Sequence, residues 1–205
     1  MKRKGKLPVS FYLQDTVTVA RALLGCTLWH MSERGPLGAR IVETEAYLGA
    51  NDPASHARRG LRSDRNQSMY LEGGHVYVYF TYGMHYCINV VTAEEGTAEA
   101  VLLRAGEPVE GIPQMWKNRS KAKRESDLLS GPGKLCMAMG IDRKLDGEHL
   151  RGARLFLTER DHPVNDADIA ITPRVGIDNS GEATHWPLRF FLAGNSNVSV
   201  SRNYR

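Results

Sequence analysis

The acidic residues of segment 41–47 are the first that could perform chemistry. A β-strand repeats its side-chain direction every two residues, which places Glu43, Glu45 and Tyr47 on one face of an expected strand. A carboxylate at such a position could serve as a general base or stabilise a developing positive charge. The strand pattern alone favours a solvent-exposed face for the two glutamates.

Aromatic residues form a second group with chemical potential. The alternating β-formers of 75–81 place His75, Tyr77 and Tyr79 on one face, and four of the eight tyrosines lie between Tyr77 and Tyr86. Aromatic rings stack on nucleic-acid bases, and each stacked base contributes about 1 to 3 kcal/mol. The same spacing also fits an aromatic-rich pair of core strands, so it leaves both interpretations open.

Basic residues are concentrated in short runs. Of the 27 Lys and Arg residues, 13 lie in segments 2–6, 58–65 and 117–124, which together contain one acidic residue, Asp64. Such pooling is typical of a protein that presents a positive face to a polyanion. The alternative for each run taken alone is a solvated loop or helix face.

The composition excludes several classes of protein. With 205 residues and 41% hydrophobic residues, the chain can form one domain with a substantial core, preceded by a basic extension over 1–10. The three cysteines suggest no disulfide framework and favour a reducing compartment. Segment 73–93 lacks charged residues, but its glycines, histidines and strand-like alternation argue against a membrane span.

Metal and nucleotide motifs are weak. No His-x-x-x-His or Cys-x-x-Cys spacing is present, and Asp52 with His56 has no obvious third ligand, so we expect no metal and no cofactor. The turn Gly131-Pro132-Gly133-Lys134 lacks the spacing of a phosphate-binding loop, although Lys134 could still bind a backbone phosphate.

Periodicity and turn residues predict the elements that would position these groups. A helix is expected over 15–24, a hairpin from strands 26–31 and 37–48, and a long connection over 49–67. Segments 75–81 and 84–92 form either a second hairpin or one sharply bent strand. Short strands are expected at 98–104, 154–158 and 189–192, with one helix after Pro108 that ends in the basic run and another that begins at 134. This order predicts a single α+β domain with a mostly antiparallel sheet.

Several motifs occur in a family-specific order along nearly the whole chain. They are the runs 40–49, 54–56, 76–84 with 87–89, 101–104, 131–136, 174–176 and 187–190. In these motifs the chain resembles the alkyladenine (3-methyladenine) DNA glycosylase family. The resemblance implies a compact, metal-free α+β domain with a curved sheet, flanking helices and a protruding β-hairpin.

The resemblance also implies residue roles. Glu45 matches the general base that activates the attacking water, while Arg104 and the main chain of Val175 match the groups that hold this water. The base pocket would comprise Tyr47, His56, Tyr79, Asn89 and Leu102. Tyr82 and Met84 would enter the DNA, and the backbone would be bound by Arg58, Arg65 and Lys134. The sequence departs from the family around Asp64 and Gln67, in a loop expected to contact DNA.

The implied activity is removal of damaged purines from duplex DNA by a monomer. No lysine matches a catalytic position, so a monofunctional enzyme without strand cleavage is expected, in a bacterial cytoplasm and nucleoid or in a nucleus. A non-catalytic damaged-DNA-binding protein is the alternative. A carbohydrate glycosidase using Glu43 and Glu45 fails on geometry, because residues about 6.5 to 7 Å apart on one strand point the same way and cannot flank a bond.

Overall fold

The long strand β2 (Gly35–Tyr47) lies at the centre of the sheet. The computed structural model describes residues 4–199. One edge of β2 pairs with β5 (Glu99–Glu110). The other edge pairs first with β1 (Thr27–Ser32) and then, at positions 43–45, with β8 (Arg189–Leu192). The strand that carries the two glutamates is therefore covered along both edges.

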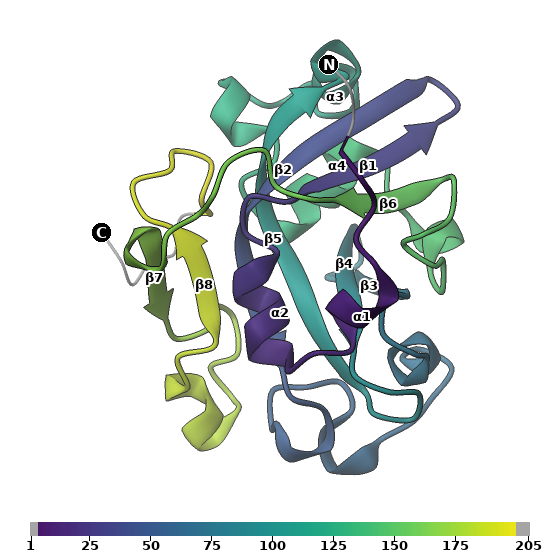
Figure 1. Cartoon of the computed structure of the whole chain (residues 1–205), viewed down its shortest axis with the longest axis vertical. Coiled ribbons are helices and arrows are strands. Elements are labelled where there is room, and N and C mark those ends of the chain that lie inside the picture. Colours follow the sequence, from purple (N-terminus) through teal and green to yellow (C-terminus); the bar gives the residue numbers. More distant parts are fainter. Residues whose placement is uncertain (1–3, 200–205) are drawn as a thin grey trace.

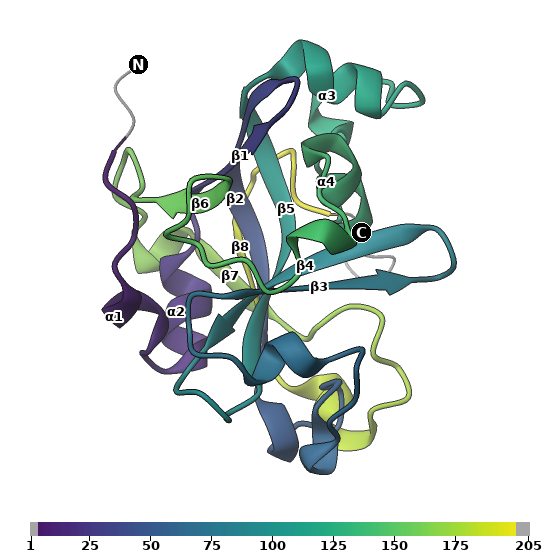
Figure 2. The ribbon, with the colours of Figure 1, turned by 90° about the vertical axis from the view of Figure 1, so that its right-hand side faces the viewer.

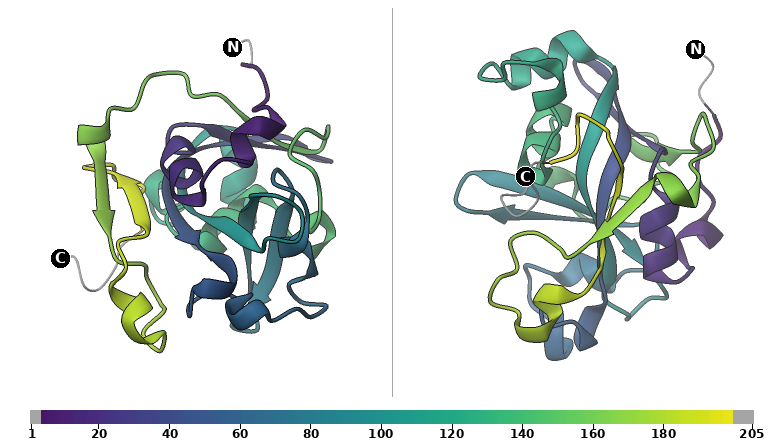
Figure 3. Two further views of the ribbon diagram at one scale, coloured as in Figure 1. Left: turned by 60° about the horizontal axis from the view of Figure 1, so that its bottom comes forward. Right: turned by 90° about the vertical axis from the view of Figure 1, so that its left-hand side faces the viewer.

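The strand order is β3-β4-β5-β2-β1-β6, and β7 pairs with β8 beside β2 (Figures 1 and 3). The remaining strands are β3 (Val76–Thr81), β4 (His85–Thr92), β6 (Leu155–Thr158) and β7 (Ile169–Thr172). The α-helices are α1 (Val9–Tyr12), α2 (Thr16–Ala22), α3 (Ile112–Asn118) and α4 (Pro132–Met139). All strand pairings among residues 4–199 are antiparallel. This curled sheet with few helices confirms the expected α+β class.

Helix α2 covers one face of β2. Asp15 caps the helix by accepting the backbone N–H of Thr18 at 2.9 Å, which satisfies one of the free donors of the first turn. Thr44 on β2 faces the helix and donates its hydroxyl to the carbonyl of Ala20 at 2.8 Å. Because strand side chains alternate, this contact directs Glu43 and Glu45 away from α2.

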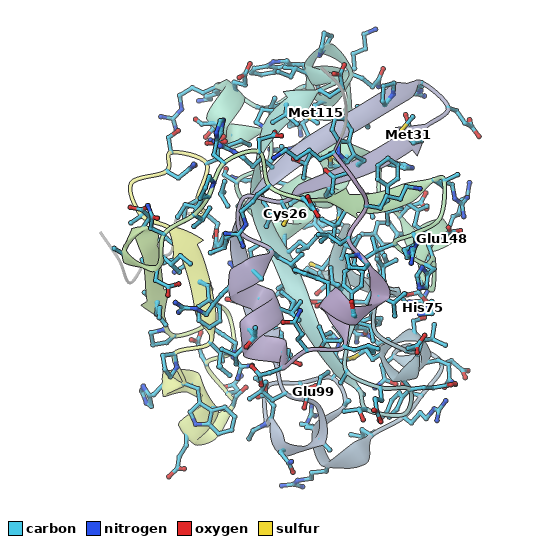
Figure 4. All side chains as sticks on the ribbon, viewed as in Figure 1. Cys26, Met31, His75, Glu99, Met115 and Glu148 are labelled. Atoms are coloured by element: carbon cyan, nitrogen blue, oxygen red, sulfur yellow. The ribbon has the colours of Figure 1, made fainter. Side chains whose placement is uncertain are left out.

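The main core lies between the sheet and its helices. Its fully buried members include Leu23, Leu28, Ile41 and Leu103, each of which contributes roughly 1.5 to 3 kcal/mol through burial. Cys26 and Met115, labelled in Figure 4, are buried in the same cluster. All three cysteines are free. This core holds β2 in place, and the opposite face of that strand carries Glu43 and Glu45.

The hairpin of β3 and β4 extends beyond the rest of the sheet (Figure 2). At its tip, Tyr82 and Gly83 both have positive φ angles, of 51° and 66°, as in the mirror-image turns that suit hairpin twist. The N–H of Met84 closes the turn on the carbonyl of Thr81 at 3.2 Å. Tyr82 is 82% exposed and Met84 is 67% exposed. The protruding hairpin is therefore confirmed, with two large apolar side chains at its end.

Several elements differ from the sequence-based expectations. Strand β5 continues through Pro108 to Glu110 instead of ending at Arg104. At this point the register with β2 shifts between Gly38 and Ala39, which lie opposite Glu110 and Pro108, and proline is tolerated in a strand at such a β-bulge. Helix α3 ends at Asn118, so Lys117 is the only basic residue of the run 117–124 that it includes. The short helix α1 and the strand β7 were not expected.

The first described residues pack on the domain. Lys6 forms a β-bridge with Thr158, the N–H of Leu7 donates to the carbonyl of Leu157, and the Leu7 side chain is buried. Of the expected basic extension, residues 1–3 lie outside the described part of the chain. Within residues 4–199, no helix has the length and apolar character needed to cross a bilayer.

Candidate active site

A cavity of about 220 Å³ opens beside the β3–β4 hairpin. Its walls come from β2, β3, β4 and β5, from the loop that follows β2, and from the segment that follows β7. The expected site residues among its lining are Tyr47, His56, Tyr79, Tyr82, Asn89, Leu102, Arg104 and Val175. Residues that are far apart in the sequence therefore meet at one concave site.

The carboxylate of Glu45 lies fully buried behind this lining, where two hydrogen bonds and one ion pair hold it. The Tyr47 hydroxyl donates to Oε2 at 2.8 Å, the backbone N–H of Val175 donates to Oε1 at 2.7 Å, and Arg104 Nη1 lies 3.2 Å from Oε1. Such a carboxylate is fixed in place and can accept a proton from a water or stabilise a nearby cation. The exposed face expected from the strand pattern is therefore wrong for Glu45.

The partners of Glu45 are held in the protonation states that let them donate. Burial, followed by the negative charge of Glu45, raises the pKa of Tyr47 well above that of a free phenol. Burial opposes the charge of Arg104, but the neighbouring Glu45 and Glu43 raise the pKa of its guanidinium further. Tyr47 therefore keeps its proton and Arg104 its charge.

Glu43 is also fully buried, which contradicts the expected exposure, and it binds two arginines. Its Oε1 accepts from Arg104 Nε at 2.8 Å and from Arg189 Nε at 2.7 Å, and its Oε2 accepts the N–H of Ser199 at 2.6 Å. Burial disfavours its charge, yet the two arginines lower its pKa below the usual value. Because Glu43 and Glu45 contact the same guanidinium from one strand face, they cannot flank a substrate bond.

Three aromatic rings form one wall of the cavity. His56 and Tyr79 meet edge to face with their centroids 4.6 Å apart, and Tyr77 stacks on Tyr79 at 5.2 Å. Tyr77 was not among the expected site residues, and its hydroxyl lies 2.9 Å from His56 Nδ1. The sequence feature that could have indicated a site role for Tyr77 is its spacing of two residues from Tyr79, which places both side chains on one face of the strand. Burial raises the pKa of Tyr77 to about 12.

His56 is uncharged at neutral pH. Burial lowers its pKa to about 4, with smaller contributions from the positive charges of Arg65 and Arg58. The imidazole is therefore available as a neutral ring for stacking and as a single hydrogen-bond donor and acceptor. Its loop position, next to two exposed arginines, follows from the long connection between β2 and β3.

The floor of the cavity comes from β4 and β5. Asn89 pairs with Leu102 across these strands, and both side chains are buried. Asn89 Nδ2 donates to the carbonyl of Tyr77 at 3.1 Å, which fixes the orientation of its amide. The free thiol of Cys87 also lines the cavity, and burial raises its pKa. Apart from Arg104, the residues of β4 and β5 that line the cavity are uncharged.

The residues expected to contact DNA are on the surface. Arg58, Arg65 and Lys134 are exposed, and the guanidinium of Arg65 lies 5.6 Å from the centre of the Tyr79 ring. Lys134 Nζ donates to Ser130 Oγ at 3.3 Å at the start of α4. In the run 117–124, Arg124 forms an ion pair with Asp127.

The possible metal pair is not brought together as ligands. Asp52 forms a fully buried ion pair with Arg174, while His56 contacts Tyr77. Residues 4–199 contain no cluster of three or more His, Cys, Asp or Glu side chains that could hold a metal ion.

Comparison with known proteins agrees with this geometry. Residues 10–196 match the family model described as methylpurine-DNA glycosylase. Relatives named "Putative 3-methyladenine DNA glycosylase" include one from Carboxydothermus hydrogenoformans, 49% identical over 94% of this chain and 98% of its own length. A relative from Bdellovibrio bacteriovorus is 46% identical over 94% of this chain and 98% of its own length. One from Desulfitobacterium hafniense is 46% identical over 98% of this chain and 100% of its own length. The chain therefore belongs to the methylpurine-DNA glycosylase family.

Proposed function

We propose that this protein is a monofunctional DNA glycosylase that flips damaged purines out of duplex DNA and hydrolyses their N-glycosidic bond. The observation that carries the proposal is the placement of Glu45. Its carboxylate lies directly behind an aromatic cavity and is held by Tyr47, Val175 and Arg104, three residues that line this cavity. A non-catalytic DNA-binding protein would have no need for a buried carboxylate at that point.

Access to the base requires the lesion to leave the stack. Unstacking costs a few kcal/mol and is cheapest at a damaged or mismatched pair. Tyr82 and Met84 at the exposed tip of the hairpin can fill the gap in the duplex. The extruded purine would then stack between Tyr47 and the rings of His56 and Tyr79, with Asn89 and Leu102 beneath it.

Bond cleavage would proceed through an oxocarbenium-like sugar. The electron pair of the N-glycosidic bond leaves with the purine, and a water oxygen attacks C1′ while Glu45 accepts the water proton. The carboxylate also stabilises the positive charge that develops on the sugar. Arg104 and the Val175 main chain would orient the water. Among the described residues that line the cavity there is no lysine, which supports hydrolysis without a Schiff base.

The cage suits two classes of damaged purine. Alkylation at N3 or N7 makes the base cationic, which improves it as a leaving group and favours it through cation–π attraction to the tyrosines. Hypoxanthine and ethenoadenine are neutral, so they depend on stacking, on hydrogen bonds and on a proton for the departing base. One chain supplies every residue of this site, consistent with a monomer, and Arg58, Arg65 and Lys134 would bind the DNA backbone.

Single-turnover base release tests the proposal. Duplexes that carry hypoxanthine, ethenoadenine or a methylated purine are incubated with excess wild-type protein, Glu45→Gln or Glu148→Gln. The last variant is the matched control, because Glu148 pairs with Arg154 at a position outside the cavity lining. We expect release by the wild type and Glu148→Gln but not by Glu45→Gln, which should still bind the lesion. Tight binding without release by any of them would favour the non-catalytic alternative.

A further inference from the structure

Arg174 and Asp52 form an ion pair that is fully buried beside the cavity. Asp52 lies on the loop after β2, and Arg174 lies two residues beyond β7. The contact is bidentate, with Arg174 Nη2 2.8 Å from Asp52 Oδ1 and Nη1 bound to Oδ2. Asp52 also accepts the N–H groups of Leu48 and Ala54, at 3.1 and 2.9 Å. The pair therefore joins two segments that are distant in sequence.

The same guanidinium contacts the strand that carries Glu45. Its Nη1 donates to the carbonyl of Ala46 at 2.9 Å, and its central carbon lies 4.6 Å from the centre of the Tyr47 ring. A planar cation at that distance holds the ring by stacking and cation–π attraction. The hydroxyl of this ring is the donor to Glu45 Oε2, so Arg174 supports one of the groups that hold the carboxylate.

The next residue in the chain supplies another of these groups. Val175 follows Arg174 directly, and its N–H donates to Glu45 Oε1 at 2.7 Å. Fixing the side chain of Arg174 against Asp52 and Ala46 therefore also fixes the peptide that presents this N–H. Both hydrogen-bond donors to Glu45 therefore depend on one arginine that does not itself line the cavity.

Stability alone is a poor explanation for this arrangement. Removing two charges from water is costly, and a well-packed apolar pair often stabilises a protein as much or more. Moreover, Arg174 Nε is buried and makes no hydrogen bond with the described residues. The flat face over Tyr47 and the bidentate fork toward Asp52 are properties that an apolar side chain or a lysine cannot reproduce.

We propose that Arg174, anchored by Asp52, is a positioning residue that sets the Tyr47 ring and the Val175 amide and thereby aims the Glu45 carboxylate. The inference rests on the proposed glycosylase function. Displacement of a catalytic group by about 1 Å can cost on the order of 100-fold in rate. Loss of the guanidinium should consequently slow base release while the DNA-binding surface remains intact.

The test is Arg174→Lys, which keeps the positive charge opposite Asp52 but removes the flat, forked group. Single-turnover release at saturating protein should fall roughly 10- to 100-fold. Affinity for the lesion duplex is measured in the Glu45→Gln background, so that no base is released during the titration. Adding Arg174→Lys to that background should change the affinity less than about threefold. Leu155→Ala, which opens a core cavity in β6, controls for loss of stability and should leave the release rate unchanged.

A double-mutant cycle with Tyr47→Phe identifies the route of the effect. If Arg174 acts through Tyr47 and Glu45, the combined variant should lose less rate than the product of the two single losses. Should Arg174→Lys fail to fold, Asp52→Asn replaces it, because it keeps the guanidinium and loosens its anchor. Release within about twofold of wild type in the folded variant, or fully multiplicative losses, would overturn the inference. Absence of release by the wild type would instead refute the proposed function.

Discussion

The backbone N–H of Val175 donates to Glu45 Oε1 at 2.7 Å, although 130 positions separate the two residues. The contact is made possible by β8, which pairs with β2 at positions 43–45, and by β7, which pairs with β8 and ends just before Arg174. The small β7–β8 unit thus carries the segment 173–177 to the edge of the strand that bears the candidate general base.

Glu43→Gln should destabilise the fold. The change leaves Arg104 and Arg189 without their shared counter-charge in a buried site, and breaking a buried pair costs about 3 to 5 kcal/mol. Urea denaturation at pH 7 measures this loss. The double variant Glu43→Gln/Arg189→Gln removes one charge of each sign and should recover part of the stability. No recovery would contradict the charge-balance explanation.

The same carboxylate should contribute to acid sensitivity. Because the folded protein lowers the pKa of Glu43, its stabilisation is present above the unfolded value of about 4.3 and is lost as pH falls through the lower folded value. The wild type should therefore lose stability more steeply below pH 4 than Glu43→Gln does. Parallel pH profiles of the two proteins would argue against this role.

His56 should remain neutral throughout the range in which free histidines titrate. The pKa of His56 is about 4 in the folded protein and about 6.5 in the unfolded chain. Because the unfolded chain takes up this proton at the higher pH, folding stability falls as the pH drops from about 6.5 to about 4. NMR titration of the imidazole should show no transition above pH 5. Burial is the main cause, so Arg65→Ala should raise the pKa only modestly, and a His56 transition near pH 6.5 in wild type would refute the assignment.

Tyr82→Asn should make the protein more stable and less able to hold a flipped lesion. Tyr82 adopts a left-handed φ of 51°, a conformation that Asn tolerates better, so the free energy of unfolding should rise by about 1 kcal/mol. Loss of the exposed ring should weaken binding to lesion duplex relative to undamaged duplex. Thermal denaturation and paired binding titrations measure the two effects, and an unchanged affinity ratio would exclude the wedge role.

Lys134→Ala should reduce the salt dependence of DNA binding. If Lys134 neutralises one phosphate, the slope of log affinity against log salt should fall by about 0.9. Lys6→Ala is the matched control, because Lys6 precedes α1, which lies on the opposite side of the molecule from the hairpin in Figure 2. Equal slopes for wild type and Lys134→Ala would remove Lys134 from the DNA-binding surface.

Local patterns were sufficient for most elements, and the family resemblance supplied the candidate site residues. The period-two spacing predicted β2 and the two hairpins, because strand alternation and turn residues act over a few positions. Ordered motifs indicated Glu45, Arg104 and Val175 through the family resemblance. The end of β5 was misplaced, because a strand tolerates proline at a β-bulge, and the position of a bulge depends on pairing partners that are remote in the chain.

Burial and partnership were decided by the tertiary fold. Glu43 and Glu45 look exposed on an isolated strand, yet β5, β8 and Ser199 enclose them and supply the arginines and amides that make burial tolerable. Likewise, the sequence allows Asp52 to be a metal ligand, but in the folded protein its carboxylate is paired with Arg174, which is 122 positions away. A side chain's solvation depends on everything that packs around it, and those neighbours come from segments that only long-range folding brings together.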